Sequence, residues 1–189
     1  MQTPRVLAAV LLAAFPLSCE QAPPPEPPQA ALPAAPAVVE PAAAPVPEAP
    51  KELGPVHKIT VRDLDGNPVS LAQYAGRPMI IEIWATWCGP CRQNRATVHS
   101  LRAGFPEKLV VIGVSMDTGA QLVKSFLQSN PANDGEFMAT QEFNDFVALK
   151  NASGLIPKTM YVDSRGRVAD LAEGVQSAKW LQAMAKNLR

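Results

Sequence analysis

Two cysteines separated by two residues stand between a run of apolar residues and a segment typical of a helix. The run at residues 78–85, PMIIEIWA, has the pattern of a strand that is buried on both faces of a sheet. Cys88 and Cys91 follow this run, and residues 91–103 are predicted to be helical. The free N–H groups and the positive dipole end of a helix N-terminus favour a thiolate. The arrangement therefore predicts a nucleophilic thiol at Cys88 and a resolving thiol at Cys91.

The residues around this pair favour redox chemistry over metal binding. Pro90 falls in the first helical turn, where its missing N–H removes no hydrogen bond. A Cys-x-x-Cys pair can also be half of a zinc site. However, the third cysteine of the chain is the distant Cys19, and His57 and His99 lack ligand-like spacing with the pair. We interpret His99 as an ordinary helix-surface residue and expect no metal site.

The rest of the C-terminal region alternates between strand-like and helix-like segments. Strands at 57–62 and 69–71 flank a turn and form a predicted hairpin. The other predicted elements are a buried strand at 109–115, helices at 120–128 and 141–150, a second hairpin from strands 159–163 and 167–173, and a final helix at 177–188. That last helix is amphipathic, with Trp180, Leu181 and Met184 on one face. The alternation predicts an α/β fold around one sheet.

The N-terminal residues 1–18 resemble an export signal. Arg5 precedes an apolar run that is too short to span a bilayer as a stable helix. The run ends just before Cys19, and this junction resembles a bacterial lipoprotein cleavage box, in which the cysteine is lipidated. Ordinary secretion with cleavage nearby and an uncleaved signal anchor are the two alternatives.

A linker at residues 19–56 comes next, composed mostly of Ala, Pro, Glu and Val. Repeated proline removes backbone donors and favours polyproline II, so this segment cannot build a packed core. One domain, at residues 57–189, remains. Charge is balanced over the chain, with 17 basic and 17 acidic residues, so we expect no nucleic-acid partner.

The stretch WATWCGPC at residues 84–91 resembles the thioredoxin superfamily, in particular its extracytoplasmic branch of TlpA/ResA-like redoxins and cytochrome c maturation thioredoxins. A second motif, GLIPKTMYVD at residues 154–163, matches the G-x-x-P-x-T-x-x-x-D segment of that branch. The resemblance covers about residues 57–188. It implies a thioredoxin-like fold, with a central mixed β-sheet flanked by helices and an N-terminal β-hairpin extension. It also implies that the Cys88–Cys91 disulfide works without a cofactor.

The resemblance assigns roles to three further residues. Pro157 corresponds to the cis proline of the family, and Ile156 before it would present its main chain to an extended substrate peptide. A trans loop proline is the alternative. Glu82, inside the apolar run, corresponds to a buried acid that relays protons to and from the second cysteine. We expect burial to raise its pKa, the alternative being a position on the solvent face of an edge strand.

The residues next to the cysteines are expected to divide between core and surface. Trp84 is predicted to lie in the core. Trp87 adjoins Cys88 and is predicted to line the substrate surface together with Gly89 and Pro90, since an indole offers a flat amphipathic contact.

The predicted helix after the cysteines departs from its relatives. Many of them read C-[RK]-x-E-x-P, whereas this chain has Asn94 and Ala96. The chain therefore lacks both an expected kink and an acidic residue that we place on the surface. Arg92 and Arg95 either help to hold a Cys88 thiolate or form a solvated helix face.

These observations predict an exported, lipid-anchored thiol–disulfide oxidoreductase of the periplasm. The Gly-Pro pair between the cysteines is that of thioredoxin, whose potential of about −270 mV indicates a reductant. By resemblance, its substrates are apocytochrome c thiols or other periplasmic protein disulfides, and a membrane electron donor recharges it.

Two other classes remain as alternatives. A copper chaperone or thiol-binding module would use the reduced pair as a soft-metal site. Such proteins usually have a C-x-x-x-C spacing and a downstream histidine, and no histidine follows His99 in this chain. A peroxidase-type thiol enzyme is the second alternative.

Overall fold

The structure is a computed structural model that describes residues 52–188. The predicted signal peptide at 1–18, Cys19 and the linker up to residue 51 lie outside the described residues. The described part of the chain includes nearly all of the predicted domain.

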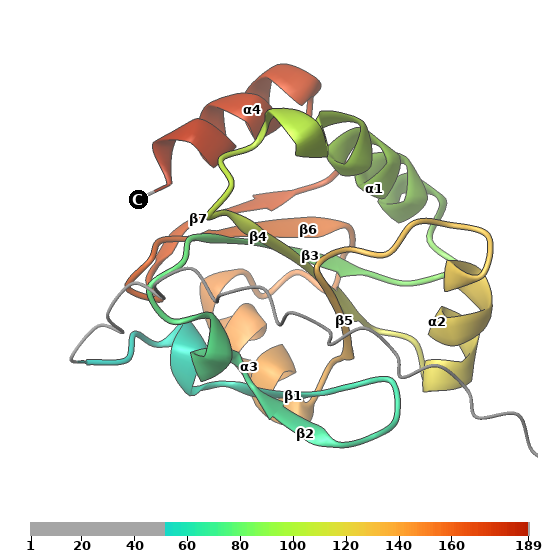
Figure 1. Cartoon of the computed structure of the whole chain (residues 1–189). Coiled ribbons are helices and arrows are strands. Elements are labelled where there is room, and N and C mark those ends of the chain that lie inside the picture. Colours follow the sequence, from blue (N-terminus) through green and yellow to red (C-terminus); the bar gives the residue numbers. More distant parts are fainter. Residues whose placement is uncertain (1–51, 189) are drawn as a thin grey trace, which may run out of the picture. The chain divides into compact units, whose positions relative to one another are not determined.

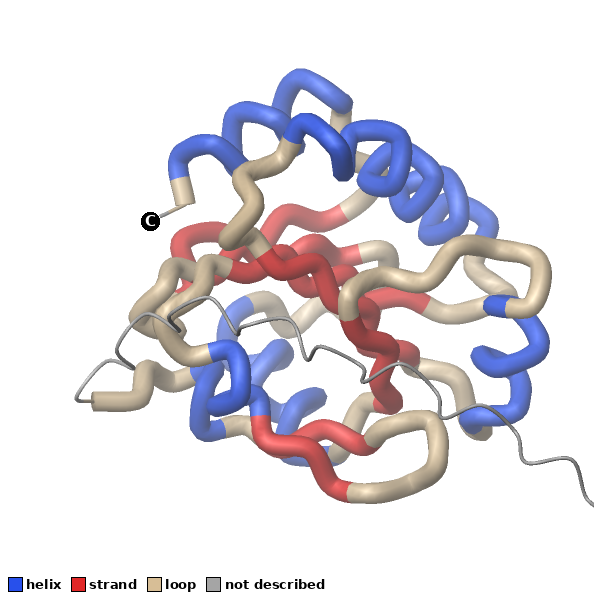
Figure 2. The backbone as a smooth tube through the Cα atoms, viewed as in Figure 1, coloured by secondary structure: helices blue, strands red, loops and turns tan. Residues whose placement is uncertain are grey.

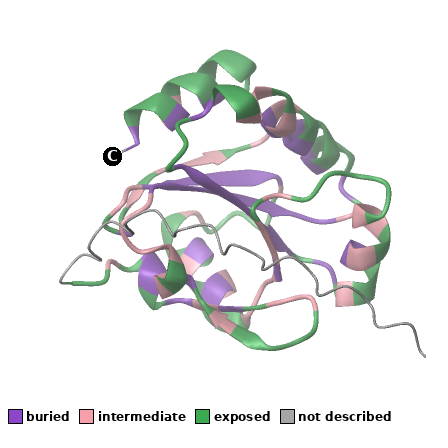
Figure 3. Cartoon of the chain, in the orientation of Figure 1, coloured by how far each residue is buried: buried purple, intermediate pink, exposed green. Residues whose placement is uncertain are grey.

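Seven strands form one mixed sheet in the order β2-β1-β5-β4-β3-β6-β7 (Figure 1). They are β1 (Thr60–Arg62), β2 (Pro68–Ser70), β3 (Met79–Trp84), β4 (Val110–Ser115), β5 (Gly135–Met138), β6 (Lys158–Val162) and β7 (Val168–Glu173). β4 runs parallel to both β3 and β5, and the remaining neighbours are antiparallel. β3 and β4 are buried along their whole length, as Figure 3 shows. The predicted α/β fold around one mixed sheet is confirmed.

Helices cover both faces of this sheet (Figure 2). α1 (Gly89–Leu101) and α4 (Ala178–Asn187) lie on one face, and α3 (Gln141–Lys150) lies on the other. α2 (Ala120–Leu127) packs through Val123 against Trp84 and the start of α1. Short 3-10 helices occupy Val56–Lys58 (η1), Leu71–Tyr74 (η2) and Arg102–Gly104 (η3). Because strand side chains alternate between faces, Ile80 packs toward α1 and α4, whereas Ile81 packs toward α3.

The N-terminal hairpin forms as predicted, with Val61 opposite Val69. Its attachment to the sheet was not predicted. β5 has only four residues, so its pattern is too short to be recognised, and it pairs with β1 through Arg62 and Met138. Residues 56–58 form η1 rather than the first part of the strand.

The final helix differs from its predicted packing. Trp180 is 44% exposed, and the buried residues of α4 are Leu181 and Ala185. The apolar face of α4 therefore includes Leu181, Ala185 and the partly buried Met184 but excludes Trp180. Among the helices of residues 52–188, none is both long enough and apolar enough to cross a bilayer.

Candidate redox site

Cys88 and Cys91 lie at the first turn of α1 and form a disulfide, with their Cα atoms 5.2 Å apart. Cys88 is the N-cap residue, and its Sγ accepts a hydrogen bond from the Cys91 backbone N–H across 3.1 Å. Cys88 is 6% exposed, whereas Cys91 is completely buried. The two sulfurs are therefore unequal: an incoming disulfide can reach Cys88 from outside, and Cys91 faces the interior.

Asp117 holds the loop that leads from β3 into α1. The backbone N–H and the hydroxyl of Thr86 donate to the Asp117 carboxylate across 2.9 and 2.7 Å, and the Ser115 hydroxyl donates to it across 2.7 Å. Asp117 was not predicted from the sequence. Its position just after β4 could have identified it in the sequence. Parallel strands end at the same edge of a sheet, so the loop after β4 meets the loop after β3 there.

The two tryptophans near the cysteines have opposite environments. Trp84 is buried, and its ring lies 5.1 Å from that of Phe126, which confirms its predicted core position. Trp87 is 68% exposed beside Cys88. An exposed indole next to the accessible sulfur offers a flat apolar contact for a polypeptide.

The segment before β6 lies against the disulfide. The Ile156–Pro157 peptide bond is cis, and the carbonyl oxygen of Ile156 is 3.9 Å from Cys88 Sγ. Lys158, which is 2% exposed, donates from Nζ to the carbonyl oxygens of Ser153 and Leu155 across 2.5 and 2.7 Å. This buried cation, which was also not predicted from the sequence, ties the loop that carries Ile156.

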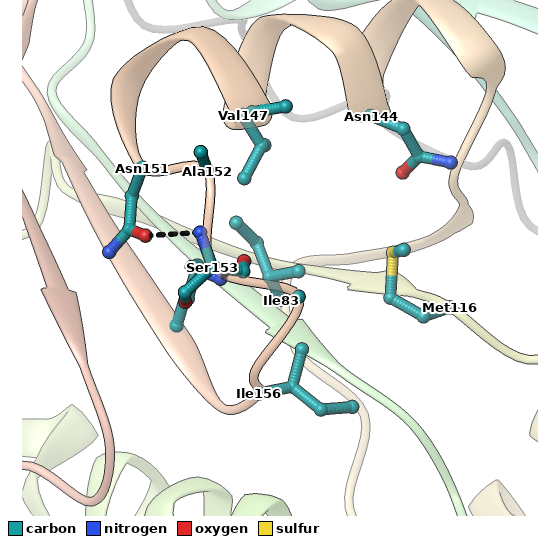
Figure 4. A pocket seen from close by; sticks show the side chains of 11 residues that line it. Ile83, Met116, Asn144, Val147, Asn151, Ala152, Ser153 and Ile156 are labelled. Atoms are coloured by element: carbon teal, nitrogen blue, oxygen red, sulfur yellow. Dashed lines mark hydrogen bonds between the residues drawn. The ribbon is translucent and has the colours of Figure 1, made fainter.

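A cavity of about 170 Å³ adjoins this loop. Figure 4 shows Val147 and Asn144 of α3 on one side of the cavity, with Ile83, Met116 and Ile156 facing them. The cavity is mostly apolar. Ile156 lines it and also contacts the disulfide through its carbonyl oxygen. It gives the surface beside Cys88 a recess of the right character for an apolar side chain.

Glu82 lies in the middle of β3 and is 1% exposed. Its Oε1 accepts a hydrogen bond from Asn94 Nδ2 across 3.2 Å, and its Oε2 accepts one from Asn133 Nδ2 across 3.0 Å. Arg95 Nη1 is 3.6 Å from Oε2. Burial raises the pKa of Glu82 to about 7, and the charge of Glu136 adds to the increase, while Arg95 and the two amides oppose it. Both carboxylate oxygens of Glu82 therefore have partners inside the fold.

Arg95 does neither of the two things proposed for it from the sequence. Its side chain is 4% exposed and points inward, where Nη2 is 2.6 Å from Glu136 Oε1. It therefore forms no solvated helix face, and its nearest anions are carboxylates rather than the Cys88 sulfur. Arg92, by contrast, is exposed.

Asn94 occupies the position of the acidic residue that we placed on the surface in its relatives, and this position is only 1% exposed. Besides its bond to Glu82, its Nδ2 is 3.2 Å from Thr159 Oγ1, and its Oδ1 accepts from the Gln176 backbone N–H across 2.9 Å. Asn94 and Arg95 follow Cys91 by three and four residues, which places all three on one face of α1. That spacing could have been recognised in the sequence. Because Glu82 contacts both Asn94 and Arg95, it lies beneath the face of α1 that carries Cys91.

His99 is half-buried rather than on the helix surface, and it lines a cavity with Arg95 and Pro131. Burial lowers its pKa, and the charge of Arg95 acts in the same direction. Within the part of the chain that the structure describes, no three His, Cys, Asp or Glu side chains are grouped as metal ligands.

Comparisons with known proteins agree with this geometry. The family described as Redoxin matches residues 41–187. Thioredoxin-like protein YneN of Bacillus subtilis is 25% identical over 123 residues, which are 65% of this chain and 72% of YneN. Thiol-disulfide oxidoreductase ResA of Oceanobacillus iheyensis is 24% identical over 127 residues, 67% of this chain and 65% of ResA. A solved thiol:disulfide interchange protein of the thioredoxin family from Chlorobium tepidum has a TM-score of 0.59 and 22% identity, covering 74% of this chain and 99% of that protein. The predicted thioredoxin-like fold is confirmed.

Proposed function

This chain belongs to the Redoxin family and is a thiol–disulfide oxidoreductase. We propose that it reduces the disulfides of other proteins outside the cytoplasm. We also propose that a lipid on Cys19 holds it at a membrane. The observation that carries the proposal is the asymmetric pair at the start of α1. The Cys88 sulfur meets the surface, whereas Cys91 is buried on the face of α1 whose Asn94 and Arg95 contact the ionisable Glu82.

The reaction runs from the reduced pair. The Cys88 thiolate attacks a substrate disulfide, so that a bond forms between Cys88 and one substrate sulfur while the substrate S–S bond breaks. The other substrate sulfur leaves as a thiolate and takes a proton from water. Cys91 then loses its proton and attacks Cys88 Sγ, which forms the Cys88–Cys91 disulfide and releases the second substrate thiolate. Two electrons pass from the dithiol to the substrate.

Glu82 is proposed as the group that accepts the Cys91 proton. It lies beneath the face of α1 that carries Cys91, and its pKa of about 7 lies near neutral pH, where a group exchanges protons most readily. Because Cys91 is buried away from bulk water, a base inside the protein is needed to accept the proton of its thiol.

The substrate surface is proposed to consist of Trp87, the Gly89-Pro90 turn and the main chain of Ile156. An extended peptide that pairs with Ile156 would bring its own cysteine beside Cys88, because the Ile156 carbonyl is 3.9 Å from that sulfur. Candidate substrates, by family resemblance, are apocytochrome c and other periplasmic proteins with disulfides.

Each cycle leaves the enzyme oxidised, so a membrane electron donor must reduce it again. The proposed tether at Cys19 would keep the domain near such a donor. The Pro-rich segment that precedes η1 would act as the spacer, since the last residue of the predicted 19–56 linker, Val56, is buried in the core of the domain.

The direction of electron flow is tested with the purified full chain carrying Cys19→Ala, which leaves two thiols. We expect it to reduce insulin disulfides with a chemical electron source and to have a potential near that of thioredoxin, about −270 mV. A potential near about −120 mV, the value of a strong oxidant, would contradict the proposed reductase.

The anchor is tested in a lipoprotein-processing bacterial host. Radiolabelled fatty acid should enter the unaltered chain, and Cys19→Ala should abolish the label. Membrane association without label would identify an uncleaved signal anchor instead.

A further inference from the structure

We propose that Arg95 and Glu136 are positioning residues that set the protonation of Glu82, because one buried guanidinium is shared unequally between two buried carboxyl groups. The inference rests on the proposed function only where it concerns the transfer of the Cys91 proton to Glu82. The electrostatic arrangement itself can be tested without substrate.

The geometry of the cluster is unequal. Arg95 Nη2 and Nη1 lie 2.6 and 3.5 Å from the two oxygens of Glu136, whereas the contact of Nη1 with Glu82 Oε2 is 3.6 Å. Asn133 joins the two acids, since its backbone N–H donates to Glu136 Oε1 across 2.8 Å and its Nδ2 donates to Glu82 Oε2 across 3.0 Å. The three charged side chains are at most 5% exposed.

The surroundings fix the guanidinium in this place. Its central carbon lies 4.1 Å from the centre of the Trp84 ring, in a cation–π contact. Gly113 of β4 provides the necessary space, because a Cβ atom there would overlap Glu136 Oε2 and lie 2.8 Å from Arg95 Nη1. The cluster is therefore built into the sheet and α1 rather than held by surface side chains.

Charge balance decides which acid carries a proton. With both acids ionised, two negative charges share one positive charge in a medium of low dielectric constant, so one carboxyl group is driven to the neutral form. Glu136 holds the shorter bond to Arg95 and the Asn133 backbone N–H. Glu82 has the longer contact with the guanidinium, and burial, the largest cause, raises its pKa to about 7, with Arg95 opposing the increase and Glu136 adding to it.

The other groups around Glu82 do not replace this pair. From α1, Asn94 contacts Glu82, and His99 lies near the charges of Arg95 and Glu136. From β6, the facing groups are Thr159 and Tyr161, and Asp170 of β7 lies opposite Tyr161. Burial raises the pKa of Tyr161 far above neutrality, so its phenol stays protonated. Burial lowers the pKa of His99, and the charge of Arg95 acts in the same direction. The variant His99→Gln serves as the control for its contribution.

The experiment follows the carboxyl carbon of Glu82 by ¹³C NMR as a function of pH in the full chain, with Glu82→Gln used to assign the signal. Glu136→Gln keeps an acceptor for Arg95 but removes the competing charge, so the titration midpoint should fall by at least about one pH unit. Arg95→Met removes the cation, so the midpoint should rise by a similar amount. Arg95→Lys should restore most of the original value.

Opposite shifts in the two variants support the proposal, since a merely structural role gives no reason for opposite signs. Unmoved midpoints, or midpoints that move in the same direction, would overturn it. If Arg95→Met fails to fold, Glu136→Gln decides alone. The rate at which Cys91 resolves a mixed disulfide is then measured against pH. If the NMR midpoints move as expected and these rates do not follow, the inference holds, and the proposed role of Glu82 fails separately.

Discussion

The Cys91 backbone N–H donates a hydrogen bond to Cys88 Sγ across 3.1 Å, so the first turn of α1 closes directly on the accessible sulfur. The same helix N-terminus that receives the disulfide would stabilise a thiolate at Cys88 after reduction. Cys91 lies one turn further along the helix and is completely buried, so a substrate cannot reach its sulfur from solvent. Attack and resolution are thereby assigned to different cysteines.

This assignment predicts different outcomes for two serine variants. Cys91→Ser should still attack a substrate disulfide and should then accumulate as a mixed disulfide, because nothing resolves it. Cys88→Ser should form no such adduct. Mass spectrometry of the products with a cysteine-containing peptide disulfide measures both. Equal trapping by the two variants would contradict the assignment.

Removal of the Glu82 carboxylate should slow the resolving step. We expect Glu82→Gln to lower the rate by about 100-fold near neutral pH, the usual scale for a lost general base. The difference should shrink at alkaline pH, where a thiol ionises without help. Stopped-flow rates across pH measure this, with the exposed Glu107→Gln as the matched control. Unchanged rates between pH 6 and 8 would make Glu82 structural.

The sequence could predict what is encoded locally. The apolar run ending before Cys88 predicts β3, and a carboxylate inside that run predicts the buried Glu82. It could not predict the partners of Glu82, because Asn133 lies 51 positions along the chain and Arg95 meets Glu136 across 41 positions. Those contacts exist only after α1 has packed on the sheet and β5 has paired with β4.

The partners of Glu82 also change an expectation about stability. From the sequence alone, an unpaired buried acid should destabilise the fold, and its removal should be favourable. In the structure, Glu82 accepts hydrogen bonds from the buried amide of Asn94 and the partly buried amide of Asn133. Glu82→Leu would leave these donors unpaired, and we expect a loss of about 1–3 kcal/mol in the free energy of unfolding.

Asn94 provides an independent test of this network. Asn94→Asp puts a second carboxylate within reach of Glu82 and removes the donor that Glu82 and Thr159 share. Like-charge repulsion should raise the pKa of Glu82 further and destabilise the protein by about 1–3 kcal/mol at pH 7. Urea unfolding at pH 7 and pH 5 measures the effect, which should be smaller at pH 5, where protons relieve the repulsion. An equal loss at both pH values would contradict the repulsion.

Lys158 is expected to matter for substrate turnover through the loop that carries Ile156. Lys158→Met removes the donor to the Ser153 and Leu155 carbonyls, so the loop loses its buried anchor at a cost of about 1–3 kcal/mol. The value of kcat/KM for insulin reduction should fall several-fold, and the exposed Lys179→Met provides the matched control. A stability loss with unchanged kcat/KM would separate the anchor from substrate docking.

His57 should make the stability of the domain depend on pH. It belongs to η1, its side chain is completely buried, and neither ring nitrogen has a hydrogen-bond partner among the described residues. Gly166 packs so closely that a Cβ atom there would strike the ring. Burial lowers the pKa of His57 below its ordinary value of 6.5, and the charge of Asp163 opposes the change.

The sign of the effect is set by this lowered pKa. Above pH 6.5 both the folded and the unfolded chain hold a neutral imidazole, and the stability is complete. As the pH falls below 6.5, the unfolded chain binds the proton first, so stability is lost until the pH has passed through the folded-state pKa.

The variant His57→Phe removes this contribution of His57 to the pH dependence of stability. Urea unfolding between pH 7.5 and 5 should therefore show a steeper loss for the unaltered chain, by up to about 1.4 kcal/mol per pH unit. Glu82 contributes a slope of opposite sign, because its pKa is raised, but it is present in both proteins and cancels in the comparison. Parallel slopes would mean that folding does not lower the pKa of His57.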